Sequence, residues 1–560
     1  MRVLPVNTDV LLVELDELSQ AVALNQSLLD DPIAGVHELV PAARTVLVRF
    51  HPTRIDAAEL TALLLERDVS APLGADGEIV QMPVSYDGDD LAEVADLLGV
   101  TPADVIAMHT ASTYTVAFTG FAPGFSYLVG GDPRLNVPRR STPRTAIPAG
   151  AVGLAGTYSG IYPRVSPGGW QIIGTTELPM FDLRLDPPAT LRPGMRVRFV
   201  EAERSTRQQP TAPQTAAVAG DDSGSRTALE VVEPGLGSTL QDLGRPGHAD
   251  LGVSRSGALD HDSARLAARL VGNASDAASI ETHGGLRLRA IGELVLAVTG
   301  AQVSATVRPA STPETETETD AERPAARMPA PRSAPELQAF ALRDGETLEL
   351  GFPTRGNVAY VGVRGGFAVA PVLDSLSTDV LSGLGPEPLR AGDVLPVRRA
   401  AVAAVAQIWG ADAPDDTLHS RLPAPGDVVT LDVVLGPRTE MFADDAVQAL
   451  FDQQWEVTAQ SNRVGLRLHG PTPLERRDHR ELESEGTSSG ALQVPPNGQP
   501  VLFMADHPLT GGYPVIGSVA SYHLNLAGQV PIGASIRFRA VTDPQGQASA
   551  TDDASLTKEN

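Results

Sequence analysis

The chain of 560 residues contains no cysteine and only one lysine, Lys558, close to its C-terminal end. The absence of cysteine excludes disulfide bonds, thiolate nucleophiles and zinc sites built on cysteine. Since 42 of the 43 basic residues are arginine, the folded body has no lysine for a Walker A phosphate loop, a Schiff base or a biotin carrier. These absences exclude several large enzyme classes.

Long apolar runs and an excess of positive charge are also missing. The apolar run at 401–411 is much shorter than the roughly 18 residues that a membrane span needs. The N-terminus lacks the apolar core of a secretory signal, so we expect a cytoplasmic protein without a membrane partner. The formal net charge of −26 argues against a nucleic-acid partner, because neutralising phosphates requires clustered cations.

Two polar stretches divide the chain. The segment 201–227 is rich in Pro, Ala, Gly and Ser, which is typical of a flexible linker. The acidic, Pro-rich segment 307–336 predicts a disordered insertion within a domain. The expected units, in chain order, are an N-terminal α/β domain over 1–82, a β domain over 83–200, the linker, a second body over 228–543 and a disordered tail over 544–560.

Local capping signals predict where the helices begin. Asp56 is expected to cap a helix over 56–68, and Thr101, followed by proline, to cap another. The second body has one clear helical pattern, over 259–273, with Asp260 as its N-cap. These helices are few for a chain of this length.

Most of the remaining sequence has the pattern of β structure. From Tyr114 onward the helical period disappears, and short apolar runs alternate with Pro-Gly turns, which is typical of a barrel or a sandwich. The second body repeats this pattern. We therefore expect a mainly β protein with α+β character, in which a small α/β N-terminal domain precedes duplicated β-barrels.

Short echoes support the duplication. "SGAL" occurs at 256–259 and again at 489–492, and "AGAV" occurs at 149–152. "GIYP" at 160–163 is answered by "GGYP" at 511–514. Three echoes in comparable contexts indicate a repeated β-barrel module.

Aromatic residues are scarce, yet eight of the 24 lie between Tyr114 and Trp170. The same segment carries five arginines, and "TGFAPGFSYL" at 119–128 places three rings at a tight turn. Rings interleaved with arginines around Pro-Gly turns could line a pocket for a planar or anionic ligand. The alternative is a hydrophobic core surrounded by solvated arginines, and both interpretations stay open.

Other polar residues stand at bends. His109 ends a predicted helix, and a lone histidine is more often structural than catalytic. Asp242 and Arg245 share a Gly-rich turn, where they either form a local ion pair or serve a function. The stretches 461–468 and 505–514 are similar loop-plus-strand segments. No HExxH, GxSxG, GxGxxG or GxxxxGK[ST] pattern is present, so neither a zinc site nor a standard phosphate loop is predicted.

Longer motifs carry a family resemblance. "GFAPGFSYL", "PRRSTPRTAIPAGAV" and "GIYPRVSPGGWQIIGTT" resemble the allophanate hydrolase subunit 1 family, also called KipI-like or the 5-oxoprolinase B subunit. "PGLGSTLQDLGRPG", "SNRVGLRL", "SSGALQVPPNGQPV" and "TGGYP" resemble the subunit 2 family, called KipA-like or the 5-oxoprolinase C subunit. The chain therefore resembles a fusion of the two subunits.

The resemblance implies cyclophilin-like β-barrels in both halves and one of three functions. The first is an ATP-dependent 5-oxoprolinase, with Mg²⁺ and a separate A subunit of the LamB/YcsF type. The second is the carboxyltransferase of a urea carboxylase-type system, and the third is a regulatory protein that binds a histidine kinase. We favour the first, because the missing carrier lysine means that carboxyl transfer would need a carrier in trans.

For this small-molecule reaction we expect His109, Asp242 and Asp506 as acid–base groups. Arg139 and Arg144 are expected to contact anions, while the rings around 121–127 pack on the substrate. Whether the chain forms a homo-oligomer is left open. The residues expected to bind substrate are Phe121, Phe125, Tyr127, Arg139, Arg144, Tyr162, Trp170, Arg245, Asn462 and Tyr513.

Overall fold

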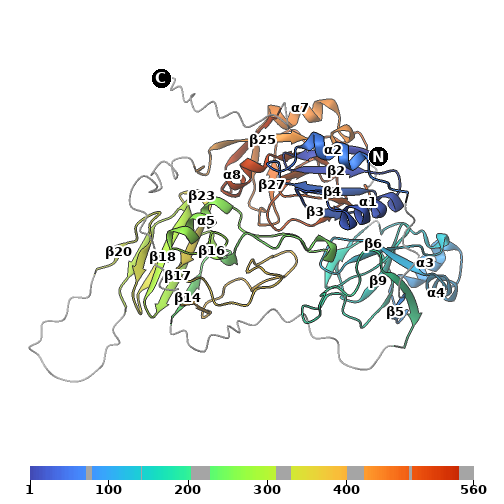
Figure 1. Ribbon diagram of the computed structural model, residues 1–560, viewed down its shortest axis with the longest axis horizontal. Coiled ribbons are helices and arrows are strands. Elements are labelled where there is room, and N and C mark those ends of the chain that lie inside the picture. Colours follow the sequence, from blue (N-terminus) through green and yellow to red (C-terminus); the bar gives the residue numbers. More distant parts are fainter. Residues whose placement is uncertain are drawn as a thin grey trace, which may run out of the picture.

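The computed structural model describes residues 1–70, 79–140, 142–203, 227–310, 330–399, 422–478 and 482–541 (Figure 1). The fold is mainly β, as predicted, with 37% strand and 16% helix. The apolar run at 401–411, almost all of the predicted linker and the tail over 544–560 lie outside the described residues.

The N-terminal unit is a four-stranded antiparallel sheet in the order β1-β2-β4-β3. Asp56 caps the second of its two helices, as predicted, and accepts a hydrogen bond from the backbone N–H of Glu59 at 2.8 Å. The elements are β1 (Arg2–Asn7), β2 (Val10–Glu14), α1 (Leu18–Asp30), β3 (Val36–Pro41), β4 (Thr45–Phe50) and α2 (Ala57–Leu65).

The next unit is the first barrel, whose seven-stranded sheet has the order β12-β9-β10-β7-β6-β13-β5. Ser85 and Thr175 exchange two backbone hydrogen bonds of 2.8 Å, which join the two edges of this sheet and close it. A separate two-stranded ribbon pairs β8 with β11. The strands are β5 (Ile79–Val84), β6 (Tyr114–Thr119), β7 (Ser126–Val129), β8 (Arg144–Ile147), β9 (Ala151–Ala155), β10 (Tyr158–Ile161), β11 (Ser166–Gly168), β12 (Gln171–Thr175) and β13 (Arg196–Glu201).

Two helices cover one end of the first barrel, α3 (Leu91–Leu98) and α4 (Pro102–Ala111). Thr101 caps α4, as predicted, in a full capping box with Asp104. A short 3-10 turn, η1 (Pro133–Leu135), follows β7. The boundary expected after residue 82 falls inside β5, which pairs with β13 and so belongs to the barrel.

The last unit is a second, closed barrel with the order β25-β32-β29-β30-β27-β26-β33. This order repeats that of the first barrel strand for strand, and the ribbon β28–β31 corresponds to β8–β11. In both barrels the first and last strands pair in parallel, so the duplication is confirmed. The strands are β25 (Val428–Leu435), β26 (Trp455–Val457), β27 (Gly465–His469), β28 (Glu485–Gly486), β29 (Ala491–Gln493), β30 (Val501–Phe503), β31 (Thr510–Gly511), β32 (Val515–Val519) and β33 (Ser535–Ala540).

The repeated topology shows which of the sequence echoes occupy equivalent positions in the two barrels. Gly150 and Gly490 precede equivalent strands with φ of +81° and +88°, so "AGAV" and the second "SGAL" are true counterparts. "GGYP" at 511–514 leads into β32 and corresponds to the "GGW" at 168–170, and not to "GIYP". The "SGAL" at 256–259 lies outside both barrels.

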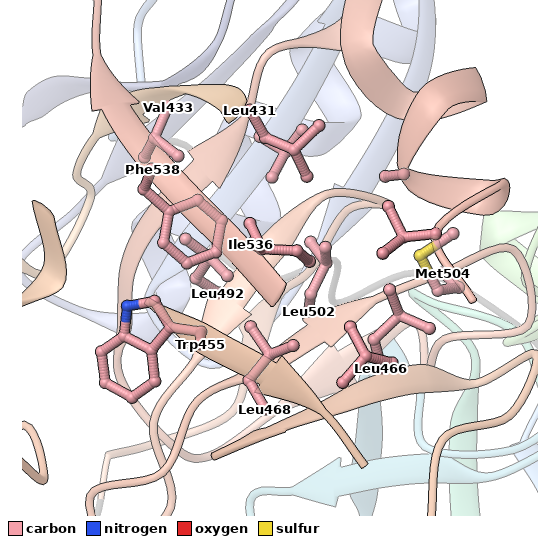
Figure 2. Close-up of a cluster of buried hydrophobic side chains, with 14 of the residues drawn as sticks. Leu431, Val433, Trp455, Leu466, Leu468, Leu492, Leu502, Met504, Ile536 and Phe538 are labelled. Atoms are coloured by element: carbon pink, nitrogen blue, oxygen red, sulfur yellow. The ribbon is translucent and has the colours of Figure 1, made fainter. Parts of the chain in front are cut away.

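The interior of the second barrel is a dense apolar cluster (Figure 2). Trp455 is fully buried at one end of it, and its indole N–H donates to the carbonyl of Leu450 at 3.0 Å. Besides the one helix predicted for this half, short helical segments pack around this barrel. They are η3 (Thr439–Met441), α7 (Asp444–Asp452), η4 (Ser521–His523) and α8 (Leu524–Gly528).

Between the barrels in sequence lies a sandwich of two sheets, β20-β19-β22-β17-β14-β24 and β15-β16-β23-β18-β21. Asp260 caps its helix α5 (His261–Leu270), as predicted. The ends of the predicted insertion pair as β19 and β20. The strands and the 3-10 turn are β14 (Ala228–Pro234), β15 (Thr239–Gln241), η2 (Ala249–Leu251), β16 (Ser279–Thr282), β17 (Leu286–Ile291), β18 (Leu294–Gln302), β19 (Ala305–Arg308), β20 (Arg332–Ser333), β21 (Phe340–Leu342), β22 (Thr347–Leu350), β23 (Arg355–Val363) and β24 (Val394–Pro396).

The first and last units of the chain pack side by side (Figure 1). The face of the N-terminal sheet opposite its helices buries Leu12 and Leu47 against Leu509 of the second barrel. Arg438, only 5% exposed, adds an ion pair from the second barrel to Glu14 at 2.7 Å. The two halves of the sequence therefore do not form two separate bodies.

Candidate functional site

The segment 248–260, here called the strap, links the sandwich to both barrels. Thr119 of the first barrel donates its hydroxyl to the carbonyls of Ala249 and Asp250, at 3.2 and 2.8 Å. The backbone N–H of Gly124 donates to the carbonyl of Leu251 at 2.9 Å. The "TGFAPGFSYL" turn therefore lies where the two halves of the chain meet.

Contact between turn and strap is so close that it requires glycine at 252. Gly252 has φ of +75°, and a Cβ atom there would lie 2.7 Å from the carbonyl oxygen of Ala122. On its other side, the turn reaches the second barrel, because the N–H of Phe121 donates to the hydroxyl of Thr510 at 3.2 Å. Three units thus meet at one turn.

We expect Gly252→Ala to lower the free energy of unfolding by about 1 kcal/mol more than Gly99→Ala does. Both glycines have positive φ, so both substitutions carry the same backbone strain, but a Cβ at Gly99 meets nothing within 4 Å. Urea unfolding of the two variants measures the difference. Equal losses would show that the strap is not tightly packed against the turn.

The predicted rings are gathered beside this junction. Phe125 lies at the centre, with its ring centroid 5.2 Å from that of Tyr162 and 5.4 Å from that of Trp170, both edge-to-face. Four of the five rings that the sequence predicted are buried, whereas Phe121 is partly exposed. The cluster comprises Phe121, Phe125, Tyr127, Tyr162 and Trp170, together with Phe118 and Tyr158.

Arg139 stands at the exposed rim of this cluster. Burial raises the pKa of Tyr127, Tyr158 and Tyr162, while the positive charge of Arg139 opposes this effect at all three. The phenols therefore stay protonated at neutral pH and can donate hydrogen bonds. Ser484 of the second barrel reaches the hydroxyl of Tyr127 at 3.5 Å, so this rim also lies at the seam between the barrels.

Arg144 is engaged in a bidentate ion pair with Asp90, at 2.8 and 2.7 Å. Burial would raise the pKa of Asp90, but hydrogen bonds from Arg144 and from the N–H of Ile172 hold it below its usual value. Arg140 also contacts Asp90, at 2.6 Å. The pair ties β8 to the start of α3.

His109 lies inside the first barrel with no exposed surface. Its Nδ1 is 2.7 Å from the hydroxyl of Tyr86, its Nε2 is 2.9 Å from that of Ser159, and its ring stacks on Phe199. Burial lowers its pKa to about 3, so the imidazole is neutral. The hydrogen-bond partners and the stacked ring of His109 therefore belong to the barrel interior and not to the 119–128 turn.

Asp242 and Arg245 both hold one loop of the sandwich, at 372–385. Asp242 accepts from the N–H of Leu376 at 2.7 Å and from the hydroxyls of Ser375 and Ser377 at 2.7 and 2.5 Å. Arg245, 1% exposed, donates to the carbonyls of Ser377 and Val372. The residues that the structure describes contain no ion pair between Asp242 and Arg245.

Asp506 belongs to a buried ion cluster that joins the strap, the sandwich and the second barrel. Its partner is Arg463, whose Nε and Nη2 each donate to Asp506 at 3.0 Å, while Nη1 donates to Glu281. Arg463 also donates to the carbonyl of Gly257 in the strap at 2.5 Å. We call Arg463, Asp506 and Glu281 the ion cluster; they are 5%, 0% and 1% exposed.

Asn462, which the sequence indicates as a binding residue, lies in the same bend as Arg463. Asn462 is exposed, and its side chain accepts from the N–H groups of Val464 and Gly465, which shapes the turn. Tyr513, 45% exposed, lies in the second barrel, in the stretch 505–514. The sequence feature that could have indicated Arg463 is a positive charge between two apolar strands. Its acidic partners, however, are 43 and 182 residues away in the sequence.

A cavity of about 1150 Å³ lies between the N-terminal sheet, the first barrel and the start of the strap. Sequence reasoning did not single it out. Its apolar residues come largely from α1, from β3 and from the segment between them, and its polar residues are spread over α1, β3, β5, β13, the turn before β13 and the strap. The polar lining residues are Asn25, His37, Glu38, Gln81, Arg192, Arg196 and Asp250.

Within the described ranges, no set of three or more acidic or histidine side chains is placed to hold a metal ion. Nor is any helix there both long enough and apolar enough to cross a membrane.

Comparisons with known proteins divide the chain in two. Residues 1–191 match the family model described as carboxyltransferase domain, subdomain C and D, and residues 251–540 match subdomain A and B of the same domain. The B subunit of the 5-oxoprolinase of Bacillus subtilis (strain 168) is 39% identical over 186 residues, which are 30% of this chain and 78% of the relative.

The other half and the whole chain also have close counterparts. The C subunit of the 5-oxoprolinase of Escherichia coli (strain K12) is 32% identical over 320 residues, which are 55% of this chain and 90% of the relative. The crystal structure of TTHA0988 superposes with a TM-score of 0.78 and 34% identity, and covers 95% of this chain and 99% of that chain.

Proposed function

The chain belongs to the carboxyltransferase-domain family and carries both of its subdomain pairs, and from this we propose that it is the fused B and C component of an ATP-dependent 5-oxoprolinase. The reaction opens the lactam of 5-oxo-L-proline to L-glutamate. A separate A subunit of the LamB/YcsF type completes the enzyme.

The observation that best supports this proposal is the way the halves pack. Relatives named as the B and C subunits of 5-oxoprolinase each match one half, and here the strap and the N-terminal sheet bury contacts between those halves. A fusion of two proteins that act together explains such contacts. The seam at "TGFAPGFSYL" is then the place where a substrate site is shared.

At this seam, protein groups can bind and orient a small cyclic amide. We assign Arg139 to the substrate carboxylate, and the protonated phenol of the partly exposed Tyr158 to the lactam oxygen or nitrogen. The partly exposed ring of Phe121 packs on the apolar face of the five-membered ring. His109 and Asp506 have no exposed surface, so we assign them supporting roles in the barrels and not proton transfer.

ATP, when bound with Mg²⁺, supplies the activation that lactam opening needs, because amide resonance makes the carbonyl a poor electrophile. Mg²⁺ in nucleotide sites is commonly held by one or two carboxylates plus phosphate oxygens. The cavity offers such a donor set, with Asp250 near an arginine, so the residues present fit the group.

Mixing the purified chain with a candidate A subunit, 5-oxo-L-proline and ATP is expected to give glutamate and ADP in equal amounts. Leaving out either protein should abolish both products. Arg139→Gln should raise the KM for 5-oxoproline at least tenfold, while the exposed Arg184→Gln, a matched change on the first barrel outside the seam, leaves it unchanged.

The second candidate is carboxyl transfer to urea or a similar amide, which the printed description of the family model favours. Because Lys558 is the only lysine, the biotin carrier would be a separate protein. If no ADP forms with 5-oxoproline, but urea is carboxylated once a carrier is added, the first candidate is wrong.

A further inference from the structure

We infer that the cavity between the N-terminal sheet, the first barrel and the strap binds a phosphate-bearing ligand of nucleotide size, with its phosphates at Arg192. The inference rests on the proposed function only in naming ATP as the ligand to test. Neither family-model match includes the turn 192–196 or the residues 247–250, which form the polar wall.

The size of the cavity sets the class of ligand. Its volume of about 1150 Å³ exceeds the roughly 300–1,000 Å³ of typical pockets for drug-sized ligands, so it is far larger than a five-membered lactam needs. Leu28, Ile33, Val36 and Leu39 give it an apolar wall from α1, β3 and the segment between them. This wall suits a flat heterocyclic base, while Arg192 and Asp250 come from other parts of the lining.

The charge of the ligand follows from Arg192. Its side chain is partly exposed, but its Nε atom is buried and has no hydrogen-bond partner among the residues that the structure describes. Leaving a buried N–H donor unpaired costs free energy, so a partner for this Nε is expected. In a chain with 69 acidic and 43 basic residues, an arginine without a carboxylate partner at a cavity wall indicates an anionic ligand.

The carboxylates that line the cavity are compatible with an anionic ligand. Glu38 pairs with Arg49 at 2.9 Å and is therefore neutralised. Asp250 borders the cavity close enough to Arg192 to feel its charge, but the two form no ion pair among the described residues. One carboxylate beside a phosphate site is a suitable ligand for the Mg²⁺ that accompanies a nucleotide.

The test is equilibrium binding of Mg·ATP to the purified full chain, without a partner protein and without 5-oxoproline. We expect saturable binding at one site, weaker competition by inorganic phosphate and no competition by 5-oxoproline. Arg192→Gln should weaken binding at least tenfold. Arg198→Gln is the matched control, because Arg198 lies on β13, just after the turn that carries Arg192, and is exposed and does not line the cavity.

A second pair of variants tests the charge of the ligand without changing Arg192. Leu29 lines the cavity and is 55% exposed, so a charge there should not disturb folding. At low salt, Leu29→Glu should weaken Mg·ATP binding several-fold, and Leu29→Arg should not weaken it. Equal effects of the two changes would contradict an anionic ligand in this cavity.

Failure of this inference and failure of the proposed function are distinguishable. If the chain binds no ATP, or binds it equally well after Arg192→Gln, the cavity is not the nucleotide site. The complete assembly can then still open the lactam with nucleotide held elsewhere. If the chain binds ATP as expected but the assembly releases no glutamate, the proposed function fails and the cavity assignment stands.

Discussion

Arg463→Met is expected to lower the free energy of unfolding of the second barrel by about 3–5 kcal/mol. The substitution leaves the carboxylates of Asp506 and Glu281 buried without their guanidinium partner. It also removes the hydrogen bond to Gly257, which is one of several that hold the strap at this end. The single change therefore affects the second barrel, the sandwich and the strap together.

Fluorescence of Trp455 during urea unfolding reports on this barrel once Trp170 and Trp409 are replaced by phenylalanine. The matched control is Arg467→Met, an exposed arginine on β27, the strand that follows the bend of Arg463. The triple change Arg463→Met, Asp506→Asn and Glu281→Gln should recover part of the loss, since no uncompensated charge remains. A loss no larger than that of Arg467→Met would show that the ion cluster contributes little.

Mild acid should destabilise the protein strongly between pH 7 and pH 5. Burial lowers the pKa of His109 to about 3 and that of His507 to about 4. The unfolded chain takes up a proton at each histidine near pH 6.5, and the folded chain does not. The stabilisation that comes from each neutral buried histidine is therefore fully present above this pH. The free energy of unfolding falls as the pH drops, by about 2 kcal/mol per histidine down to pH 5.

Because a substitution also changes the stability itself, the quantity to compare is the slope of the free energy of unfolding against pH. His109→Gln should reduce the slope between pH 6 and pH 5 by about 1.4 kcal/mol per pH unit, the value for one proton. His469→Gln, at an exposed position on β27, should leave the slope unchanged. An unchanged slope in His109→Gln would show that His109 is protonated in the folded state.

Local features of the fold could be predicted from the sequence. Asp56, Thr101 and Asp260 cap helices as expected, because a cap depends on three or four consecutive residues. The alternation of short apolar runs and turns predicted two barrels. The matching strand order could not be predicted, because the pairing of β13 with β5 joins segments more than 100 residues apart.

The site was predictable as a set of residue types but not as a geometry. The rings around Phe125 form one group in the sequence, yet only the structure shows that most of them are buried. The bend at 461–468 points to Asn462 and not to Arg463, because burial cannot be read from a bend. The cavity draws on α1, on Arg192 and on Asp250, three distant parts of the chain, and no local pattern connects them.

The packing of the N-terminal sheet on the second barrel has a consequence for biosynthesis. Leu12 and Leu47 emerge from the ribosome long before Leu509, which covers them. At roughly 5–20 residues per second, the apolar face of the sheet waits between about half a minute and a minute and a half for its cover. The newly made chain therefore exposes this apolar surface at its oldest end until the second barrel is made, and a ribosome that stalls before that point releases a product that keeps an aggregation-prone surface.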